Sequence, residues 1–262
     1  MEKLQLGINL IRLLKNWPTF LMDYLGFFSN RQLTYRLKDG VKYDVRSGGQ
    51  DVLVIGDVWI RQVHTPPDLP IRNHDTVVDV GAHIGIFSIF ADVQANRGTI
   101  YAYEPEPENF DLLEQNIRIN RSRNIKAFRF GLSGKSEKRK LFLSSRRKTA
   151  HSFYADSEES VEVQCVTLKD VFDANGLAQI DFLKLDCEGA EYEILLGTPR
   201  DYLSRIRRIS LEYHDGVMGH NHRELRDFLE REFSVRESRE RHTNLGFLYA
   251  TNHRMIGDYA GC

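Results

Sequence analysis

Short apolar runs alternate with amphipathic stretches after about residue 71, and this pattern predicts an α/β fold. Runs rich in Val, Ile and Tyr are typical of strands buried on both faces, whereas apolar residues three or four positions apart are typical of helices. The predicted strands contain TVVDVG (76–81), GTIYAYEP (98–105), IKAFRFGLS (125–133), IDFLKLDCEG (180–189) and IRRISLEYH (206–214). Helices are predicted from Ile84 to about Gln94 and from Glu108 to Asn120. Strands and helices in alternation predict a parallel sheet with right-handed crossovers.

Other strands are predicted outside this alternation. KRKLFLSS (138–145) and VEVQCVTL (161–168) predict added strands on either side of a polar loop, and SVRESRE (234–240) with GFLYATN (246–252) predicts a closing antiparallel hairpin. The basic stretch 135–148 is most simply a solvated hairpin and loop. The alternative is that it attracts a phosphorylated, lipid-linked or acidic-glycan acceptor.

The first 70 residues follow different patterns. Four apolar residues recur at helical spacing near the start of the chain: Leu4, Ile8, Ile11 and Leu14. They predict an amphipathic helix that stops near Pro18, within a helical cap over residues 1–30. Residues 31–70 predict a small β preface, because LTYRL, VKYDV and DVLVIGDVWI alternate in the manner of short hairpin strands. The main domain is then expected over residues 71–262.

Charged residues and Pro18 interrupt the apolar N-terminal stretch, so it lacks the roughly 20 continuous apolar residues that cross a bilayer. No small-residue cleavage site follows it. The simplest interpretation is a cap that packs on the domain or on a second copy of the chain. The alternative is peripheral contact with a membrane surface through the N-terminal helix.

Composition narrows the classes of partner. With 262 residues, 41% hydrophobic and 28% charged, the chain falls in the ordinary globular class. Its 36 basic and 37 acidic residues leave no basic footprint for nucleic acid, so no nucleic-acid partner is expected. The three cysteines, Cys165, Cys187 and Cys262, form no close pair, which favours a reducing compartment, here the cytoplasm.

The segment VVDVGAHIG (77–85) predicts a strand, a tight glycine turn and a helix start. Gly81 and Gly85 are expected to leave backbone N–H groups facing an anionic ligand group at the end of the helix dipole. Glu104-Pro105 ends the next strand, about 20 residues later, where a carboxylate accepts hydrogen bonds from ribose hydroxyls. A nucleoside cofactor is therefore predicted.

The spacing of this turn favours S-adenosylmethionine over a dinucleotide. The dinucleotide fingerprint needs G-x-G-x-x-G, whereas this turn reads Asp79-x-Gly81-x-x-x-Gly85. Asp79 is expected beside the ammonium group of the cofactor and backbone amides beside its carboxylate. The predicted cofactor-binding residues are Asp79, Gly81, Ala82, His83, Gly85, Glu104, Pro105 and Asp186.

Three blocks of sequence carry a resemblance to a known family. DTVVDVGAHIGIFSIFA, YAYEPEPENFDLLEQNIRIN and IDFLKLDCEGAEYEILLG, in that order, are similar to the FkbM family of class I S-adenosylmethionine-dependent methyltransferases, over about residues 55–215. The resemblance implies a Rossmann-like, mostly parallel seven-stranded sheet flanked by helices. It also implies a cofactor at Asp79, Gly81, Gly85 and Glu104, and methyl transfer to a hydroxyl of a sugar or secondary metabolite. His83 departs from the family, which more often has Asn there.

Acceptor-side residues are expected where the fourth and fifth strands end. Asp186, Glu212 and His214 are the catalytic candidates, with His214 best suited to act as a base near neutral pH. Glu188 and His151 are the candidates for substrate binding. The alternatives are that Glu188 and Glu191 stabilise the following helix, and that His214 is a structural residue.

Asp186, Glu212 and His214 are also of the types that hold a divalent cation, although no metal is favoured. The predicted function is O-methyl transfer from S-adenosylmethionine to a hydroxyl of a saccharide, glycan or glycosylated or secondary metabolite. The alternative is a catalytically silent S-adenosylmethionine-binding sensor or assembly protein of the same fold.

Overall fold

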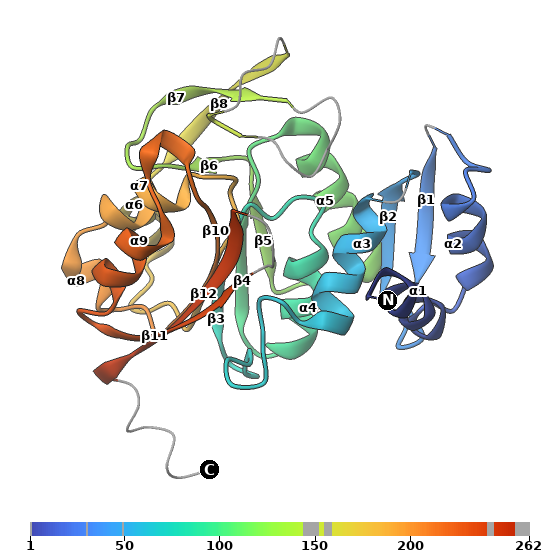
Figure 1. Ribbon diagram of the computed structural model, residues 1–262, viewed down its shortest axis with the longest axis horizontal. Helices are drawn as coiled ribbons and strands as arrows, with labels where there is room; N and C mark the ends of the chain where they lie inside the picture. The colour runs from blue at the N-terminus through green and yellow to red at the C-terminus, as the bar shows by residue number, and fades with distance from the viewer. Residues whose placement is uncertain are drawn as a thin grey trace.

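The computed structural model describes residues 2–29, 31–48, 50–143, 152–154, 159–239 and 244–254, without the side chains of residues 2 and 3. Seven strands form its central sheet in the order β11-β12-β10-β9-β3-β4-β5 (Figure 1). Their bounds are β3 Thr76–Val80, β4 Thr99–Tyr103, β5 Ile125–Phe128, β9 Phe182–Leu185, β10 Arg208–His214, β11 Phe233–Arg239 and β12 Leu245–Asn252. Strands β5, β4, β3, β9 and β10 run parallel, and β12 lies antiparallel between β10 and β11. The predicted Rossmann-like, mostly parallel seven-stranded sheet is confirmed.

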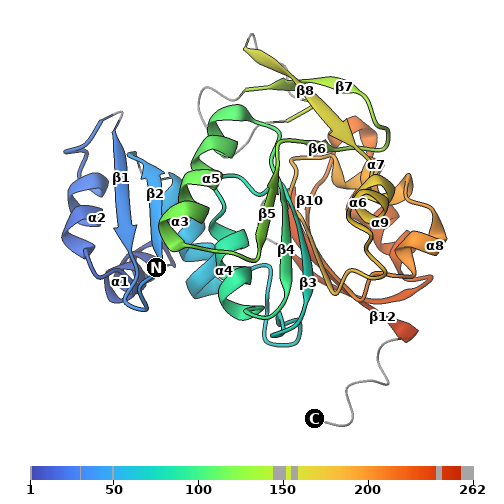
Figure 2. The same ribbon diagram turned by 180° about the vertical axis from the view of Figure 1, so that it is seen from behind.

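Helices cover both faces of the sheet (Figures 1 and 2). On one side lie α4 Ile86–Gln94 and α5 Pro107–Asn120. On the other side lie α6 Leu168–Asn175, α7 Glu191–Leu196 and α9 His222–Leu229. Two shorter elements of this part of the chain are α8 Arg200–Leu203 and the 3-10 turn η2 Val217–Gly219. Successive strand residues enter opposite cores: Val77 packs with α4, and Val78 packs with α6 and α7. Burial on both faces explains why these strands read as continuous apolar runs.

The N-terminal segment adds α1 Glu2–Leu13, α2 Trp17–Tyr24 and the antiparallel hairpin of β1 Gln32–Arg36 and β2 Lys42–Arg46. The hairpin packs on α5, where the backbone N–H of Asp44 donates to Asn116 Oδ1 at 2.6 Å. None of the helices in the described part of the chain is long and apolar enough to span a bilayer.

Two N-terminal predictions are wrong in detail. The segment 51–60 is not a strand but the helix α3 Gln50–Gly56 followed by the π-helical turn η1 Asp57–Arg61. Its buried residues Val52, Ile55 and Val58 recur every three positions, a helical spacing that the β-branched composition concealed.

The other error concerns the first helix. It ends at Leu13, and Pro18 lies in the first turn of α2, where a missing N–H costs nothing. The buried stripe is Leu6, Leu10 and Leu14, whereas Leu4 and Ile8 of the predicted stripe are exposed. Both stripes have helical spacing, so the sequence pattern alone did not distinguish the buried one.

A separate three-stranded sheet contains the added strands, in the order β6-β8-β7. Its strands are β6 Gly131–Leu132, β7 Lys138–Phe142 and β8 Ser160–Val166, with β7 and β8 antiparallel as predicted. It lies beyond one end of the main sheet (Figure 1). Within the basic stretch, Lys138 pairs with Glu162 at 2.9 Å and Arg139 pairs with Glu193. These two cations are therefore already neutralised by carboxylates.

Candidate active site

A cavity of about 260 Å³ opens where the parallel strands end. Gly81, Glu104, Asp186 and Glu212, at the ends of β3, β4, β9 and β10, all line it. The β6–β8 sheet adds a wall with Leu132 and Leu141. The opposite wall comes from α3, η1 and the loop after them: Val54, Asp57, Val58, Val63 and His64. This is the edge at which open α/β sheets bind their ligands.

The structure brings most of the predicted site residues to this cavity. Those that line it are Gly81, Ala82, His83, Glu104, Pro105, Asp186, Glu188 and Glu212. Asp79, Gly85 and His214 are not among the lining residues. His151 falls outside the described residues.

The glycine turn folds as predicted, but its backbone N–H groups donate hydrogen bonds to other groups of the protein. The N–H groups of Gly81 and Ala82 both donate to the carbonyl of Tyr103 at 3.0 Å, and the N–H of His83 donates to Glu104 Oε2 at 2.7 Å. The expectation that the turn leaves these groups free for an anionic ligand is therefore wrong. Gly81 has a φ of 73°, and a Cβ there would overlap the carbonyl oxygen of Asp186. Glycine is needed because β9 passes against the turn.

Gly85 lies at the start of helix α4 and does not line the cavity. It is the N-cap of α4 with a φ of 85°, and a Cβ there would lie 2.5 Å from Leu113 Cδ1. The predicted direct contact between Gly85 and a cofactor is not supported, because Gly85 does not line the cavity. Its role in the structure is to let α4 approach α5.

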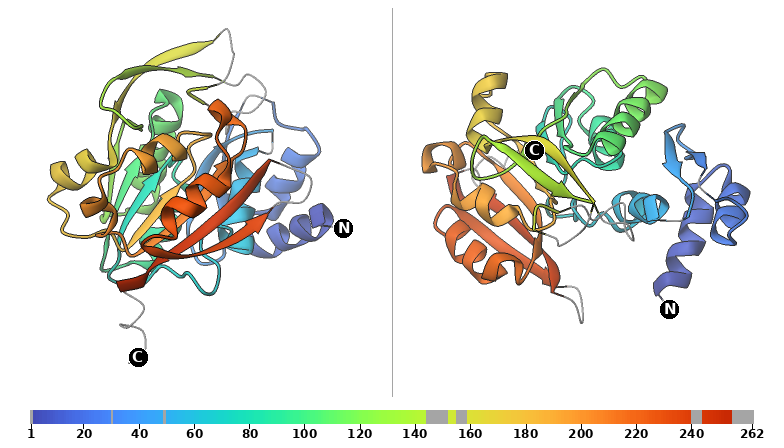
Figure 3. Two further views of the ribbon diagram at one scale, coloured as in Figure 1. Left: turned by 60° about the vertical axis from the view of Figure 1, so that its left-hand side comes forward. Right: turned by 90° about the horizontal axis from the view of Figure 1, so that it is seen from above.

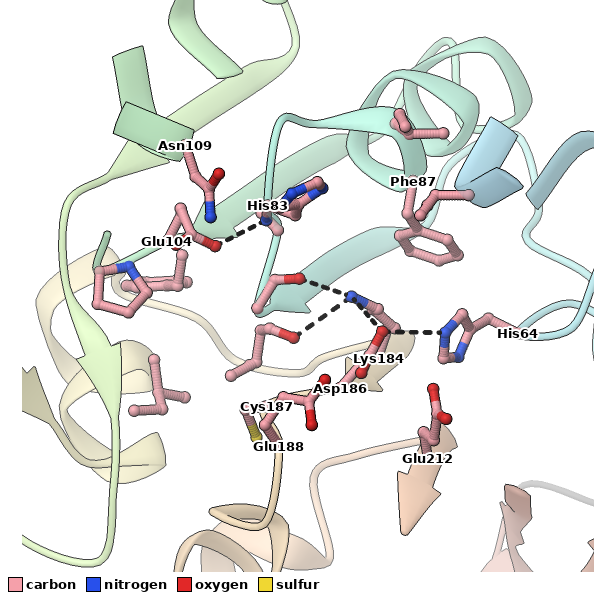
Figure 4. A pocket seen from close by; sticks show the side chains of 18 of the residues that line it. His64, His83, Phe87, Glu104, Asn109, Lys184, Asp186, Cys187, Glu188 and Glu212 are labelled. Carbon is pink, nitrogen blue, oxygen red and sulfur yellow. Dashed lines mark hydrogen bonds and ion pairs between the residues drawn. The ribbon is translucent and has the colours of Figure 1, made fainter. Parts of the chain in front are cut away.

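Glu104 points into the cavity from the end of β4 (Figure 4). Its carboxylate also accepts the N–H of Glu106 at 2.9 Å, so two backbone amides fix its orientation. Burial raises the pKa of Glu104 to about 7, against the lowering effect of these amides. A carboxylate keeps further lone pairs for hydroxyl donors, as a ribose site requires.

Asp79 is fully buried below the cavity. Lys184 Nζ lies 3.0 Å from its Oδ1, and the hydroxyl of Ser88 donates to its Oδ2 at 2.6 Å. Asp79 does not line the cavity, and its oxygens contact Lys184 and Ser88, so its predicted contact with a cofactor ammonium group stays a prediction. Lys184, which the sequence reasoning missed, lines the cavity and donates to the carbonyl of Gly81 at 2.8 Å. The sequence feature that could have identified Lys184 is its position as the one charged residue in the apolar run FLKL (182–185).

His64, Asp186 and Glu212 converge on the opposite side of the cavity from Glu104 (Figure 4). One ligand atom from each lies within 4.8 Å of the others. His64 is buried between Phe87 and Phe247, with Nδ1 3.2 Å from Ser210 Oγ and Nε2 3.6 Å from Asp186 Oδ2. His64 was not predicted, and nothing local in HTPPDLP marks it as a site residue. We call these three residues the acceptor triad.

The two carboxyl groups of the triad differ in acidity. Burial would raise the pKa of Asp186, but Lys184 and His64 outweigh it and hold that pKa well below its usual range. Burial, with the nearby charge of Asp186, raises the pKa of Glu212 to about 9. One carboxylate is therefore ionised at neutral pH, and the other has a high proton affinity.

His214 lies between two carboxylates. Its Nε2 lies 3.3 Å from Glu188 Oε2 and its Nδ1 3.3 Å from Glu191 Oε1. Burial would lower the pKa of His214, but the two carboxylates outweigh it and raise it to about 12. The two carboxylates favour the protonated form of His214, which weighs against its predicted role as a base. Glu191 also accepts the N–H groups of Cys187 and Gly189, as expected of an acid in the first turn of a helix.

His83 is held by the N-terminal hairpin. Its Nε2 lies 2.7 Å from Arg46 Nη2, and Arg46 also binds Asp51 and Asn109. His83 has a φ of 52°, a left-handed conformation that Asn adopts more readily than His. This explains physically why Asn suits the position.

Known proteins resemble this chain over the region that builds the cavity. A sequence model of the methyltransferase FkbM domain matches residues 79–247. Methyltransferase sdnD from Sordaria araneosa is 30% identical over 169 residues, which cover 52% of this chain and 65% of that protein. The 31-O-demethyl-FK506 methyltransferase FkbM from Streptomyces tacrolimicus is 25% identical over 219 residues, which cover 71% of this chain and 84% of that protein.

A third relative is the hexuronic acid methyltransferase AglP from Haloferax volcanii. It is 27% identical over 143 residues, which cover 55% of this chain and 57% of that protein. The chain therefore spans less than two thirds of the length of two of these three relatives. The family match covers more than half of the chain and includes the ends of β3, β4, β9 and β10. The chain belongs to the FkbM family of methyltransferases.

Proposed function

We propose that the chain is an S-adenosylmethionine-dependent methyltransferase that methylates a hydroxyl group of a secondary metabolite or saccharide. The observation that carries this proposal is one cavity with two opposed polar sides. Glu104 lies on the first side, and the acceptor triad lies on the second. Such a cavity suits a nucleoside at one end and a hydroxyl acceptor at the other.

The cofactor fit is supported by residues at the ends of β3 and β4. Glu104 offers a fixed carboxylate to ribose hydroxyls, and Pro105 and Leu132 offer apolar surface beside it. The absence of a side chain at Gly81 lets the chain at the end of β9 pass close to the turn that lines the cavity. S-adenosylmethionine, when bound, supplies a methyl group activated by a sulfonium. Asp186 and Glu188 place carboxylate oxygens at that edge of the cavity.

The acceptor triad is proposed to hold the hydroxyl oxygen. An oxygen atom midway among the three groups would lie about 2.8 Å or less from each, which is hydrogen-bond distance. His64 and Asp186 orient the oxygen, and Glu212 takes its proton as the oxygen gains the methyl group. A group with a raised pKa suits this task because its carboxylate is a stronger base than an ordinary one.

The acceptor class follows from the triad and from the relatives. Three polar groups suit a hydroxyl that is one of several on a polar acceptor. By its name, the Streptomyces relative acts on 31-O-demethyl-FK506 and the Haloferax relative acts on a hexuronic acid. A hydroxyl of a secondary metabolite or sugar is therefore the acceptor we propose. The free thiols of Cys165 and Cys187 are compatible with the cytoplasm as its compartment.

The decisive test is calorimetry with S-adenosylmethionine combined with detection of S-adenosylhomocysteine. Glu104→Gln is expected to weaken cofactor binding by about 1.5–3 kcal/mol, because charge-assisted hydrogen bonds to the ribose are lost. Glu114→Gln on the exposed face of α5 is the matched control and is expected to bind normally. Equal binding by wild type and Glu104→Gln would refute the cofactor position. Cofactor binding without turnover of any hydroxylated acceptor would favour the silent sensor.

The metal alternative has its own test. The acceptor triad has suitable ligand types, but Lys184 Nζ already lies 3.7 Å from Asp186 Oδ2 and supplies a positive charge there. We therefore expect methyl transfer to survive extensive dialysis against a chelator. Activity that is lost on dialysis and restored by Mg²⁺ or Mn²⁺ would assign the triad to a cation instead.

A further inference from the structure

The N-terminal helices expose an unusual number of large apolar side chains. Ten such side chains are exposed among the described residues, and seven of them lie between residues 4 and 27. These seven are Leu4, Ile8, Trp17, Met22, Tyr24, Leu25 and Phe27, with exposures from 37% to 76%. They belong to α1, α2 and the segment directly after α2. Large exposed apolar side chains concentrated in one segment of the chain favour an interaction surface there.

Basic side chains surround these apolar residues in the chain. The exposed basic residues between positions 4 and 48 are Arg12, Lys15, Arg31, Arg36, Lys38 and Lys42. Over the described residues of the same range, Asp39 is the one exposed acidic residue. Residues 1–48 contain eight basic and four acidic residues, although the whole chain has a net charge of −1. Residues 1–48 therefore carry a net positive charge.

The position of this segment leaves it accessible. In Figure 3, α1, α2 and the β1–β2 hairpin lie at one end of the molecule, outside the layers of the sheet and its helices. The buried stripe Leu6, Leu10 and Leu14 anchors α1 to the hydrophobic core beside α3 and α4. The exposed apolar residues are therefore presented by a packed scaffold and not by a loose tail. We call these seven apolar and six basic residues the basic–apolar surface.

We propose that the basic–apolar surface docks the protein on a bilayer that contains anionic lipids. Trp, Tyr and Phe insert at the headgroup level of membranes, and Lys and Arg bind anionic headgroups. A second copy of the chain fits less well, since a symmetric contact would bring the same six cations against themselves. This docking is independent of the proposed methyl transfer, because none of the thirteen residues lines the cavity.

The test is co-sedimentation of the full chain with phosphatidylcholine vesicles, with and without phosphatidylglycerol. Binding is expected with phosphatidylglycerol only, and it is expected to fall as salt concentration rises. Trp17→Ser/Phe27→Ser and Arg12→Glu/Lys15→Glu are each expected to lower the partition coefficient about tenfold or more. No sedimentation with anionic vesicles would overturn the proposal.

Matched controls come from exposed residues elsewhere. Val93→Ser/Met218→Ser removes two exposed apolar residues, and Arg223→Glu/Arg231→Glu reverses two exposed charges on and after α9. Both controls are expected to bind vesicles as wild type does, and equal losses in controls and test variants would refute the assignment of the surface. Circular dichroism verifies that each variant is folded. Light scattering that detects a dimer lost in Trp17→Ser/Phe27→Ser, without vesicle binding, would identify a second copy as the occupant.

Discussion

The Lys184–Asp79 pair shows how two single residues set the charge of the cavity. The residues are neighbours in register on the adjacent parallel strands β9 and β3, and their side chains are 4% and 0% exposed. Burial would lower the pKa of Lys184, but Asp79 and Asp186 outweigh it and raise that pKa. Lys184 therefore remains charged and keeps Asp186 ionised at the mouth of the cavity.

Removing one partner of this pair is expected to be costly. Lys184→Met leaves Asp79 buried without its cation and is expected to lower the free energy of unfolding by about 3–5 kcal/mol. Asp79→Asn/Lys184→Met is expected to recover part of that loss, since no buried charge remains. Urea unfolding measures both. Lys138→Met breaks an exposed ion pair and is the control; it is expected to lower the free energy of unfolding by less than about 1 kcal/mol. An equally small decrease for Lys184→Met would contradict the expected effect of an unpaired buried charge.

Ionisation of Glu212 is expected to lower the stability of the protein and to increase its activity. Its pKa of about 9 in the folded chain lies above the ordinary value of 4.5, so its favourable contribution to folding is complete below about pH 4.5 and is lost as the pH rises through about 9. Glu212→Gln avoids that loss. Its free energy of unfolding at pH 9 is therefore expected to exceed that of wild type by about 2 kcal/mol.

Activity should change in the opposite direction. Methyl transfer by the wild type is expected to increase toward pH 9 as Glu212 ionises, whereas Glu212→Gln loses about 100-fold in kcat and this pH dependence. Chemical denaturation at pH 5 and pH 9 and a pH–rate profile measure the two effects. Glu162→Gln, on an exposed strand, is the control. A stable and fully active Glu212→Gln enzyme would exclude Glu212 as the base.

At the scale of elements, the crossing of β9 over the turn between β3 and α4 determines the cavity floor. Gly81→Ala would direct a methyl group at the backbone of Asp186, whereas Gly85→Ala would meet the flexible end of Leu113. Both sites also have positive φ, so the strain from the backbone conformation is similar.

Gly81→Ala is consequently expected to cost at least about 2 kcal/mol more stability than Gly85→Ala. It is also expected to weaken S-adenosylmethionine binding, because the end of β9 must move. Thermal unfolding and calorimetry compare the two variants, which serve as controls for each other. Equal losses would mean that the close approach of β9 does not constrain the turn.

Elements were predictable where the local pattern matched the final burial. The apolar run at Val77–Val80 gave a correct strand because both faces of the sheet are covered. The predicted strand 125–133 instead divides into β5 and β6, which lie in different sheets. Residues 51–60 were assigned wrongly because β-branched residues there pack at helical spacing. Glu104 and Asp186 could be predicted since strand ends meet at one edge. His64 could not, because it reaches Ser210 across 146 positions of sequence.

At the scale of the whole molecule, the hydrophobic core, the cavity and the basic–apolar surface lie in different parts of the chain's fold. The sheet core is apolar on both faces, the cavity lies at its carboxyl edge, and the basic–apolar surface lies at the N-terminal end. The predicted division into residues 1–30, 31–70 and 71–262 stays a prediction. One hydrophobic cluster nevertheless extends from Leu6 and Tyr43 to Phe90 and Phe182, so these segments share a core.

The wall that α3 and η1 contribute to the cavity has a practical consequence for protein engineering. A shortened fragment that starts at residue 71 would keep every strand of the large sheet, yet it would lack Val54, Asp57, Val58, Val63 and His64. Its ligand site would be open to solvent along one flank. Grafting this catalytic unit onto another protein therefore requires the chain from about residue 50 onward.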